Sequence, residues 1–210
     1  MTENQIEEIV SRLGKEYPDA ETELNHSSPF ELLVATILSA QTTDKQVNKV
    51  TAKLFKKYNQ PEDFARLEQE DLEKEINSIG LYKNKSKYLI ETSKMILENY
   101  NGKVPDSRNE LIKLAGVGRK TANVIISCAF EKNAIAVDTH VFRLANRLGF
   151  VNSDNLTEVE NALMEKIPEE KWSDMHHYLI YHGRRVCKAR NPLCDKCILT
   201  DICPYYEKNK

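Results

Sequence analysis

Residues 111–126 read Leu-Ile-Lys-Leu-Ala-Gly-Val-Gly-Arg-Lys-Thr-Ala-Asn-Val-Ile-Ile, and this stretch decides the fold. Apolar residues recur at helical spacing on both sides of Gly116-Val117-Gly118, which predicts helices at 107–113 and 119–130 joined by a tight turn. The two glycines permit positive φ and expose backbone N–H groups where the second helix begins. We therefore expect the turn to bind an anion such as phosphate.

The Leu-x-Gly-Val-Gly spacing is typical of a helix-hairpin-helix, which grips the DNA backbone without reading bases. A helix-turn-helix bend that binds nothing has a similar pattern and remains the alternative. Further segments with helical spacing are 3–17, 29–38, 44–58, 69–78, 83–100, 139–148, 155–166 and 169–186. Residues 29–38 follow two serines, begin with proline and are apolar nearly all round, so we place them in the core. Only 134–137 suggests an extended piece, and the sequence predicts an all-α protein.

The bulk composition is that of a globular protein, with 40% hydrophobic and 30% charged residues among 210. The apolar runs are far shorter than the ~20 residues of a transmembrane helix, and residues 1–10 carry three glutamates and no basic segment. We therefore expect no membrane association and a cytoplasmic location. The net charge of −2 hides an excess of bases in 184–210, seven against three acids. A nucleic-acid partner is thus not excluded, although an ordinary solvated surface explains the same charges.

Four of the five cysteines fall within seventeen residues, spaced Cys-x6-Cys-x2-Cys-x5-Cys: Cys187, Cys194, Cys197 and Cys203. Disulfides do not suit a cytoplasmic helical protein, so the quartet predicts a soft metal centre, either zinc or an iron–sulfur cluster. Zinc sites usually pair two short knuckles far apart, and only one pair is that close here. The spacing therefore favours a cluster and leaves zinc open. We interpret the nearby His182 as a structural histidine, and Cys128 as a buried small side chain within a helix.

Lys120 lies in the first turn of the helix after the glycine turn, where a cation opposes the helix dipole. This position favours the neutral amine, the form in which lysine is a nucleophile. A surface lysine or a second phosphate contact explains it equally well. Asp138 is a possible partner, because it follows 134–137 and precedes the helix 139–148 as a predicted N-cap. A capping carboxylate stays ionised and can stabilise positive charge nearby.

Taken together, these residues resemble the endonuclease III family of the helix-hairpin-helix DNA glycosylase superfamily. The resemblance runs from Pro29 to Tyr206 and is carried by LSAQTTD at 38–44, IGLY at 79–82, GVGRKTA at 116–122, VDTHV at 137–141 and the cysteine quartet. Ala115 departs from the family, which usually has proline there. We expect a looser turn with the chemistry intact.

The resemblance implies two helical domains flanking a DNA-binding cleft. One, at 22–132, would be a six-helix barrel containing the helix-hairpin-helix at 107–130. The other would join 1–21 to 133–210 and carry a structural [4Fe-4S] cluster on the four cysteines, holding the loop 188–193 against DNA. The implied partner is double-stranded DNA with damaged bases or abasic sites. The protein would act as a monomer at the nucleoid.

The implied activity is that of a bifunctional DNA glycosylase and AP lyase that removes oxidised or ring-saturated pyrimidines. Lys120 would attack C1′ of a flipped nucleotide and form a Schiff base, β-elimination would break the strand on its 3′ side, and Asp138 would support both steps. The implied DNA-contact residues are Gln41, Leu81, Gly116, Gly118, Arg119, His140, Lys188 and Arg190. In the family, Gln41 and Leu81 fill the space left by the flipped base. A polar helix end, an ordinary apolar residue and a structural histidine remain the alternatives for Gln41, Leu81 and His140.

Two other functions stay open. A monofunctional mismatch glycosylase of the same superfamily would lack the catalytic lysine, so Lys120 argues against it. For the adenine-specific branch, the end of the chain soon after Cys203 does so too. A non-catalytic, metal-containing DNA-binding module would use Lys120 as one more phosphate contact.

Overall fold

The computed structural model describes residues 1–209, and over these residues it consists of helices and loops without a strand. The all-α prediction is confirmed. Residues 134–137 are buried and lie in an irregular segment rather than a strand. No helix among residues 1–209 is both long and apolar enough to cross a membrane.

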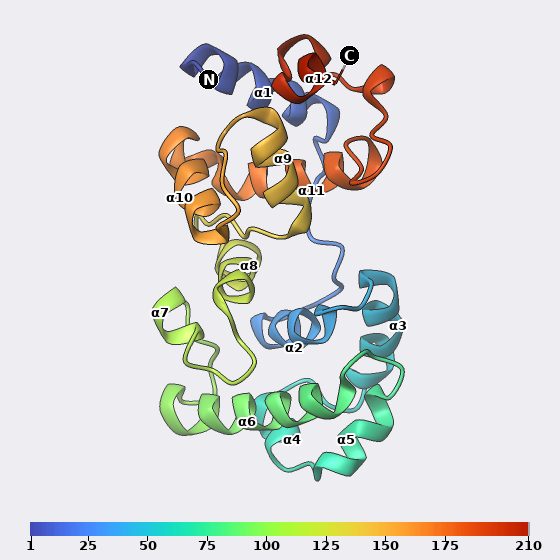
Figure 1. Cartoon of the computed structure of the whole chain (residues 1–210). Helices are drawn as coiled ribbons and strands as arrows, with labels where there is room; N and C mark the ends of the chain where they lie inside the picture. The colour runs from blue at the N-terminus through green and yellow to red at the C-terminus, as the bar shows by residue number, and fades with distance from the viewer. Residues whose placement is uncertain (210) are drawn as a thin grey trace. The chain divides into compact units, whose positions relative to one another are not determined.

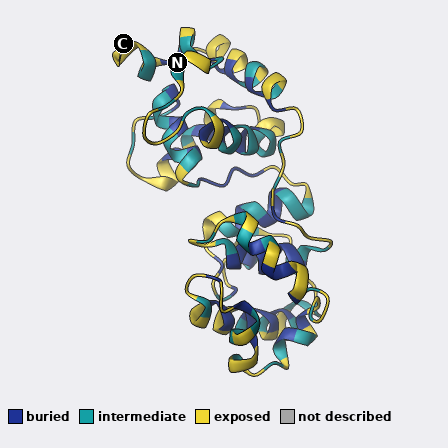
Figure 2. Cartoon of the chain, turned by 90° about the vertical axis from the view of Figure 1, so that its right-hand side faces the viewer, coloured by how far each residue is buried: buried dark blue, intermediate teal, exposed yellow. Residues whose placement is uncertain are grey.

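The chain divides into two compact units, which Figure 1 shows with their helices labelled. We call Thr22–Glu131 the central unit, and Met1–Glu21 together with Lys132–Lys210 the terminal unit. Each unit has its own buried interior, coloured dark blue in Figure 2.

The central unit contains all six helices that the sequence predicts between residues 22 and 131, and one more. Its helices are α2 (Pro29–Ser39), α3 (Asp44–Leu54), α4 (Pro61–Ala65), α5 (Gln69–Ile76), α6 (Tyr82–Tyr100), α7 (Arg108–Leu111) and α8 (Arg119–Phe130). The unexpected helix is α4, which Pro61 begins and a capping box between Gln60 and Asp63 stabilises. It has five residues, too few for a periodic pattern.

Helix α2 forms the centre of this unit, as predicted. The Ser28 hydroxyl accepts a hydrogen bond from the backbone N–H of Glu31 at 3.2 Å, and Pro29 takes the first helical position. Every residue from Phe30 to Leu38 is buried, and α2 packs against α3, α6 and α8. Because α6 and α8 both contact α2, the loops that precede them are anchored to one core.

The terminal unit contains α1 (Glu3–Glu16), α9 (Thr139–Leu148), α10 (Leu156–Lys166), α11 (Trp172–Arg185) and α12 (Pro204–Lys208), with short 3-10 turns at Glu169–Lys171, Cys194–Lys196 and Thr200–Ile202. Helix α11 packs against both α1 and α9. Their apolar faces form one core, in which Leu13, Leu144 and Leu179 are fully buried. The two helices from the ends of the chain border the cysteine segment, so the surroundings of the cysteines come from distant parts of the sequence.

Candidate functional site

The glycine turn between α7 and α8 has the predicted position but not the predicted backbone. Gly116 has φ +72°, and a methyl group added there would lie 2.9 Å from Cβ and Cγ of Tyr88. Gly118 has φ −92° and ψ 177°, an extended conformation open to any residue. The expectation of a positive-φ role for both glycines is therefore wrong for Gly118. What Gly118 provides is open space, because an added methyl group would meet nothing within 4 Å.

The rest of the turn is fixed to α6. The Thr92 hydroxyl donates to the carbonyl oxygen of Ala115 at 2.6 Å, and Val117 is buried. Ala115 stands where the family usually has proline, which would restrict the backbone. The hydrogen bond from Thr92 and the packing of Val117 restrict the turn instead.

Arg119 and Lys120 occupy the first turn of α8, and both side chains are exposed. No acidic residue stands in that turn, and no side chain caps the helix at Gly118. The N-terminus of α8 therefore combines a partial positive charge from the helix dipole with two cationic side chains. Such an end attracts phosphate.

Asp138 is the N-cap of α9, as predicted. Its Oδ1 accepts hydrogen bonds from the backbone N–H groups of His140 and Val141, both at 2.8 Å. The carboxylate is half-buried and its orientation is fixed by these two bonds. Lys120 belongs to the central unit and Asp138 to the terminal unit.

Helix α9 continues from Asp138 to two arginines that hold the start of the cysteine segment. Arg143 donates to the carbonyl oxygens of Cys187 at 3.1 Å and Gly183 at 3.0 Å. Arg147 donates to the carbonyl oxygens of Lys188 at 2.7 Å and Ala189 at 3.0 Å. Neither arginine was predicted as a site residue, although their spacing of four residues on an amphipathic helix is a signal that they share one face.

His140 is half-buried beside Gly183 of α11. Its Nδ1 lies 3.1 Å from a guanidinium nitrogen of Arg143, and a methyl group added at Gly183 would lie 2.9 Å from the same Nδ1. Burial lowers the pKa of His140, which favours the neutral imidazole. This packing is the structural contact considered above, and the DNA-contact role of His140 stays a prediction.

The four cysteines of the quartet line one small pocket of about 20 Å³, together with Leu148, His182, Val186, Pro192, Leu193, Thr200, Tyr205 and Tyr206. All four are free thiols. Burial raises the pKa of Cys197 to about 11 and also raises that of Cys203, so their thiolates need a positive partner. No three His, Cys, Asp or Glu side chains in residues 1–209 converge closely enough for a single metal ion. Four thiols at one pocket are the donor set of a soft metal centre, either an iron–sulfur cluster or zinc.

Cys128 lies apart from the quartet, in α8 of the central unit. It is half-buried rather than buried, which corrects the prediction, because its position on α8 is only partly covered.

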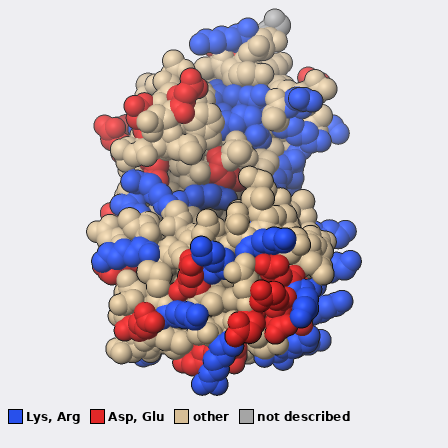
Figure 3. Space-filling view, turned by 60° about the horizontal axis from the view of Figure 1, so that its bottom comes forward, with Lys and Arg blue, Asp and Glu red and all other residues tan. Residues whose placement is uncertain are grey.

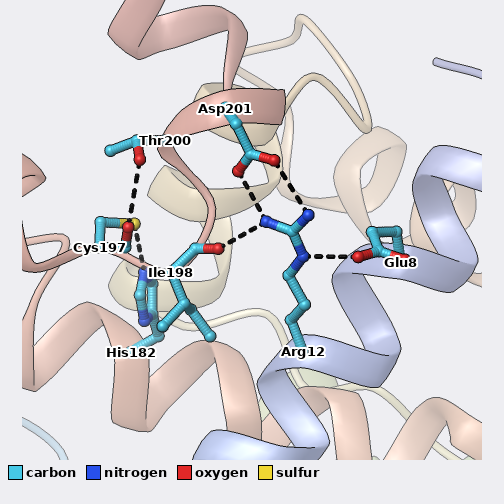
Figure 4. Close-up of polar contacts among 7 residues, drawn as sticks. All are labelled: Glu8, Arg12, His182, Cys197, Ile198, Thr200 and Asp201. Atoms are coloured by element: carbon cyan, nitrogen blue, oxygen red, sulfur yellow. Dashed lines mark hydrogen bonds and ion pairs between the residues drawn. The ribbon is translucent and has the colours of Figure 1, made fainter.

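His182 reaches the cavity through a chain of buried polar contacts that Figure 4 shows in part. Its Nε2 lies 3.3 Å from Sγ of Cys197, and its Nδ1 lies 2.9 Å from the hydroxyl oxygen of Tyr17. Burial lowers the pKa of His182 to about 4 and raises that of Tyr17 to about 12, so both are neutral near pH 7. The phenol then donates to Nδ1, and Nε2–H is left to donate to the sulfur. His182 thus contacts a cysteine of the quartet and is buried, while its structural role stays a prediction.

Arg12 of α1 joins the N-terminal helix to the end of the cysteine segment, also shown in Figure 4. Its guanidinium donates to both carboxylate oxygens of Asp201, at 2.6 and 2.9 Å, and to the carbonyl oxygen of Ile198 at 2.8 Å. A fourth bond of 2.6 Å reaches Glu8. Hydrogen bonding to Arg12 lowers the pKa of Asp201. This contact joins residues 189 positions apart, which a local pattern does not predict.

Gln41 and Leu81 stand on neighbouring loops of the central unit, and both have left-handed backbones, with φ 56° and 58°. Gln41 is exposed, and so is 56% of Leu81. The loops touch at Gly80, where an added methyl group would lie 3.4 Å from the backbone oxygen of Gln41. Non-glycine residues with positive φ are strained, and such strain gathers at functional positions.

Lys188 and Arg190 are exposed on the loop that Arg147 holds. Figure 3 shows Lys and Arg side chains gathered on one part of the terminal unit, whereas basic and acidic side chains alternate over the central unit in the lower part of that view. A phosphate backbone would therefore meet a locally positive surface despite the net charge of −2.

Comparisons with known proteins agree with these features. Residues 34–169 match the family described as HhH-GPD superfamily base excision DNA repair protein, and 187–203 match the iron-sulfur binding domain of endonuclease III. The chain is 54% identical to endonuclease III of Bacillus subtilis over 200 residues, which cover 95% of this chain and 91% of that protein.

Solved structures give the same picture. The chain superposes with TM-score 0.95 and 50% identity on a trapped endonuclease III–DNA covalent intermediate, covering 100% of this chain and 99% of the other. For a thermostable thymine-DNA glycosylase the TM-score is 0.88 and the identity 28%, with 98% of each chain covered. The similarity is thus greater to the protein trapped as a covalent intermediate.

Proposed function

The chain belongs to the endonuclease III family of the HhH-GPD superfamily, whose members are bifunctional glycosylases and AP lyases of base excision repair, and we propose that its own substrates are oxidised or ring-saturated pyrimidines and abasic sites in double-stranded DNA. We further propose that Lys120 is the nucleophile and Asp138 its electrostatic partner. The protein would work as a monomer at the nucleoid in the cytoplasm.

The reaction would begin with the neutral amine of Lys120. Its nitrogen forms a bond to C1′ as the bond from C1′ to the base breaks, and the base departs with the electron pair and takes up a proton. The amine loses its proton and the sugar ring opens to a Schiff base. Loss of a proton from C2′ then breaks the C3′–O bond, and water hydrolyses the imine to regenerate Lys120. The fixed carboxylate of Asp138 stabilises the positive charge that develops on the sugar.

Binding of the duplex would use both units. Backbone N–H groups at Gly116 and Gly118, together with the side chain of Arg119, would hold phosphate at the end of α8, where open space beside Gly118 allows close approach. Gln41 and Leu81 would occupy the gap left by the flipped nucleotide. In the terminal unit, His140 would lie near the reacting sugar, while Lys188 and Arg190 would bind phosphate.

The chain carries a [4Fe-4S] cluster, and we propose Cys187, Cys194, Cys197 and Cys203 as its ligands. When bound, the cluster would cross-link the segment, because its iron ions bond to all four sulfurs and stabilise the thiolate form that burial disfavours. The four thiol donors and the pocket that they share support this assignment.

The observation that carries the proposed chemistry is the position of Lys120, exposed in the first turn of α8 directly after the glycine turn. Borohydride reduces the imine and should link the protein covalently to DNA that contains an abasic site. Lys120→Gln should abolish the adduct, a loss of at least ~10³-fold, while affinity for the same DNA stays similar. Lys113→Gln, on the other side of the turn, is the matched control.

A full adduct with Lys120→Gln would refute the proposed nucleophile, and no adduct with the wild-type protein would refute the lyase activity. In the second case, base release without strand cleavage would identify a monofunctional glycosylase, and binding without either would identify a DNA-binding module. A panel of duplexes with single defined lesions then establishes the substrate range.

A further inference from the structure

Lys85 of α6 is buried although it is a lysine. Only 3% of the residue is exposed, whereas most lysines on α6 lie on the surface. A buried ammonium is costly unless its three N–H donors find acceptors. The structure provides three: the carbonyl oxygens of Leu38 at 2.9 Å and Ala40 at 2.6 Å, and the hydroxyl of Thr42 at 3.4 Å.

These acceptors belong to the end of α2 and to the loop that follows it. Helix α2 has no basic residue in its last turn and ends without glycine, at Ala40. The Lys85 ammonium therefore takes the place of a C-cap and meets the negative end of the helix dipole. Two of its acceptors, on Ala40 and Thr42, stand on either side of Gln41.

The main chain of Lys85 is tied to the other loop. Its backbone N–H donates to the carbonyl oxygen of Leu81 at 3.1 Å, in the first turn of α6. One residue thus bonds the residues around Gln41 through its side chain and Leu81 through its backbone. Both Gln41 and Leu81 have positive φ, a strained conformation that persists only where the surroundings enforce it.

We propose that Lys85 is a positioning residue for DNA, which fixes the Gln41 loop and the Leu81 loop at one separation so that both enter the duplex together. This rests on the proposed roles of Gln41 and Leu81. Lys85 contacts neither the DNA nor the reacting sugar; it acts through the two loops. If both loops fill the gap together, loosening one of them lowers the population of the opened duplex.

The first test is independent of any reaction. Lys85→Met keeps the length and volume of the side chain but removes the three donors, and Lys85→Gln keeps an amide donor one bond nearer the backbone. In either variant, hydrogen exchange of the backbone amides of residues 40–43 should accelerate roughly tenfold relative to wild type, because charged hydrogen bonds are lost. Exchange in α8 should stay unchanged. Lys94→Met, exposed on the same helix, is the control.

Unchanged exchange at 40–43 in both variants would overturn the anchoring role. If Lys85→Met accelerates exchange throughout the central unit, the exchange pattern of the milder variant Lys85→Gln decides between local anchoring and general packing. Loosening confined to 40–43 supports the proposal, and equal loosening everywhere overturns it in favour of a general packing role.

The second test measures the opened duplex without chemistry. A duplex carries 2-aminopurine opposite an uncleavable tetrahydrofuran abasic analogue, and its fluorescence rises when the base leaves the stack. At saturating protein, Lys85→Met should lower this rise several-fold, whereas Lys120→Gln should retain it. An equal rise with Lys85→Met and wild type overturns the proposal. The lyase activity is judged separately by the borohydride adduct, so the two proposals fail independently.

Discussion

The glycine turn of the central unit and the cysteine segment of the terminal unit are both candidate phosphate contacts, yet different interactions hold them. Tyr88 and Thr92 of α6 fix the glycine turn by ordinary packing and one hydrogen bond. The cysteine segment has few regular helices, and its start is held by Arg147 and its end by Arg12. Its four thiols line one small pocket. The first surface is complete with protein atoms alone, whereas the second depends on a bound cofactor.

The comparison is broken most severely by removing the cluster. The double variant Cys194→Ser, Cys197→Ser removes two proposed ligands. The free energy of unfolding of the terminal unit should fall by an amount that approaches the roughly 10 kcal/mol that structural metal sites contribute. Residues 187–203 should lose protection from hydrogen exchange, while α2 and α8 of the central unit keep theirs. Equal loss in both units would show that the two do not differ in this way.

Substituting the two glycines of the turn sharpens the contrast between fold and binding. Gly116→Ala forces a positive φ on alanine and brings Cβ to 2.9 Å from Tyr88, so we expect a loss of about 2–4 kcal/mol in the free energy of unfolding. Gly118→Ala meets open space but places a poorer N-cap residue at the start of α8, so we expect a loss of only about 0.5–1 kcal/mol. Its effect should instead be weaker DNA binding, because the methyl group stands where phosphate approaches. Denaturant titration and binding isotherms measure the two effects.

Arg12→Met tests how far the cysteine segment depends on the N-terminal helix. The variant loses the contacts with Asp201 and the carbonyl of Ile198, so the segment should open more often. Iron release to a chelator should become a few times faster, the scale expected for a partly exposed ion pair. Glu8→Gln, which removes only the contact on α1 itself, is the control. An unchanged rate of iron release would show that the other contacts of the segment are sufficient.

The smallest expected effect concerns the loop cations. Lys188→Gln and Arg190→Gln should each reduce the slope of log affinity against log salt by about 0.9, since each proposed phosphate contact releases one condensed counterion. The loss should be similar for all duplex sequences. Lys74→Gln, an exposed lysine of α5, should leave the slope unchanged. If a loop variant keeps the wild-type slope, the side chain that was replaced does not contact phosphate in the wild-type protein.

Local patterns predicted the parts of the fold that local forces determine. The Ser28-Pro29 start and the apolar run after it were sufficient for α2, and the cap at Asp138 follows from residue type and position. Helices α4 and α12, each of five residues, are too short for periodicity to show. The family motifs gave the cofactor and the class of reaction, while the roles of Lys120 and Asp138 remain predictions.

Long-range contacts were the part that sequence did not predict. Tyr17 and His182 are 165 positions apart, and Lys85 and Leu38 are 47 apart. A tyrosine at the end of one helix and a lysine in the first turns of another carry no local signal of a buried partner. The conformation of Gly118 was predicted wrongly, because glycine at a turn suggests positive φ when its real contribution is the absence of a side chain.

Helix α9 has a mechanical consequence. Asp138 fixes its first turn and Arg147 its last, so a stiff rod of ten residues, about 15 Å long, connects the carboxylate with the cysteine loop. A displacement of the loop would therefore shift the carboxylate as well.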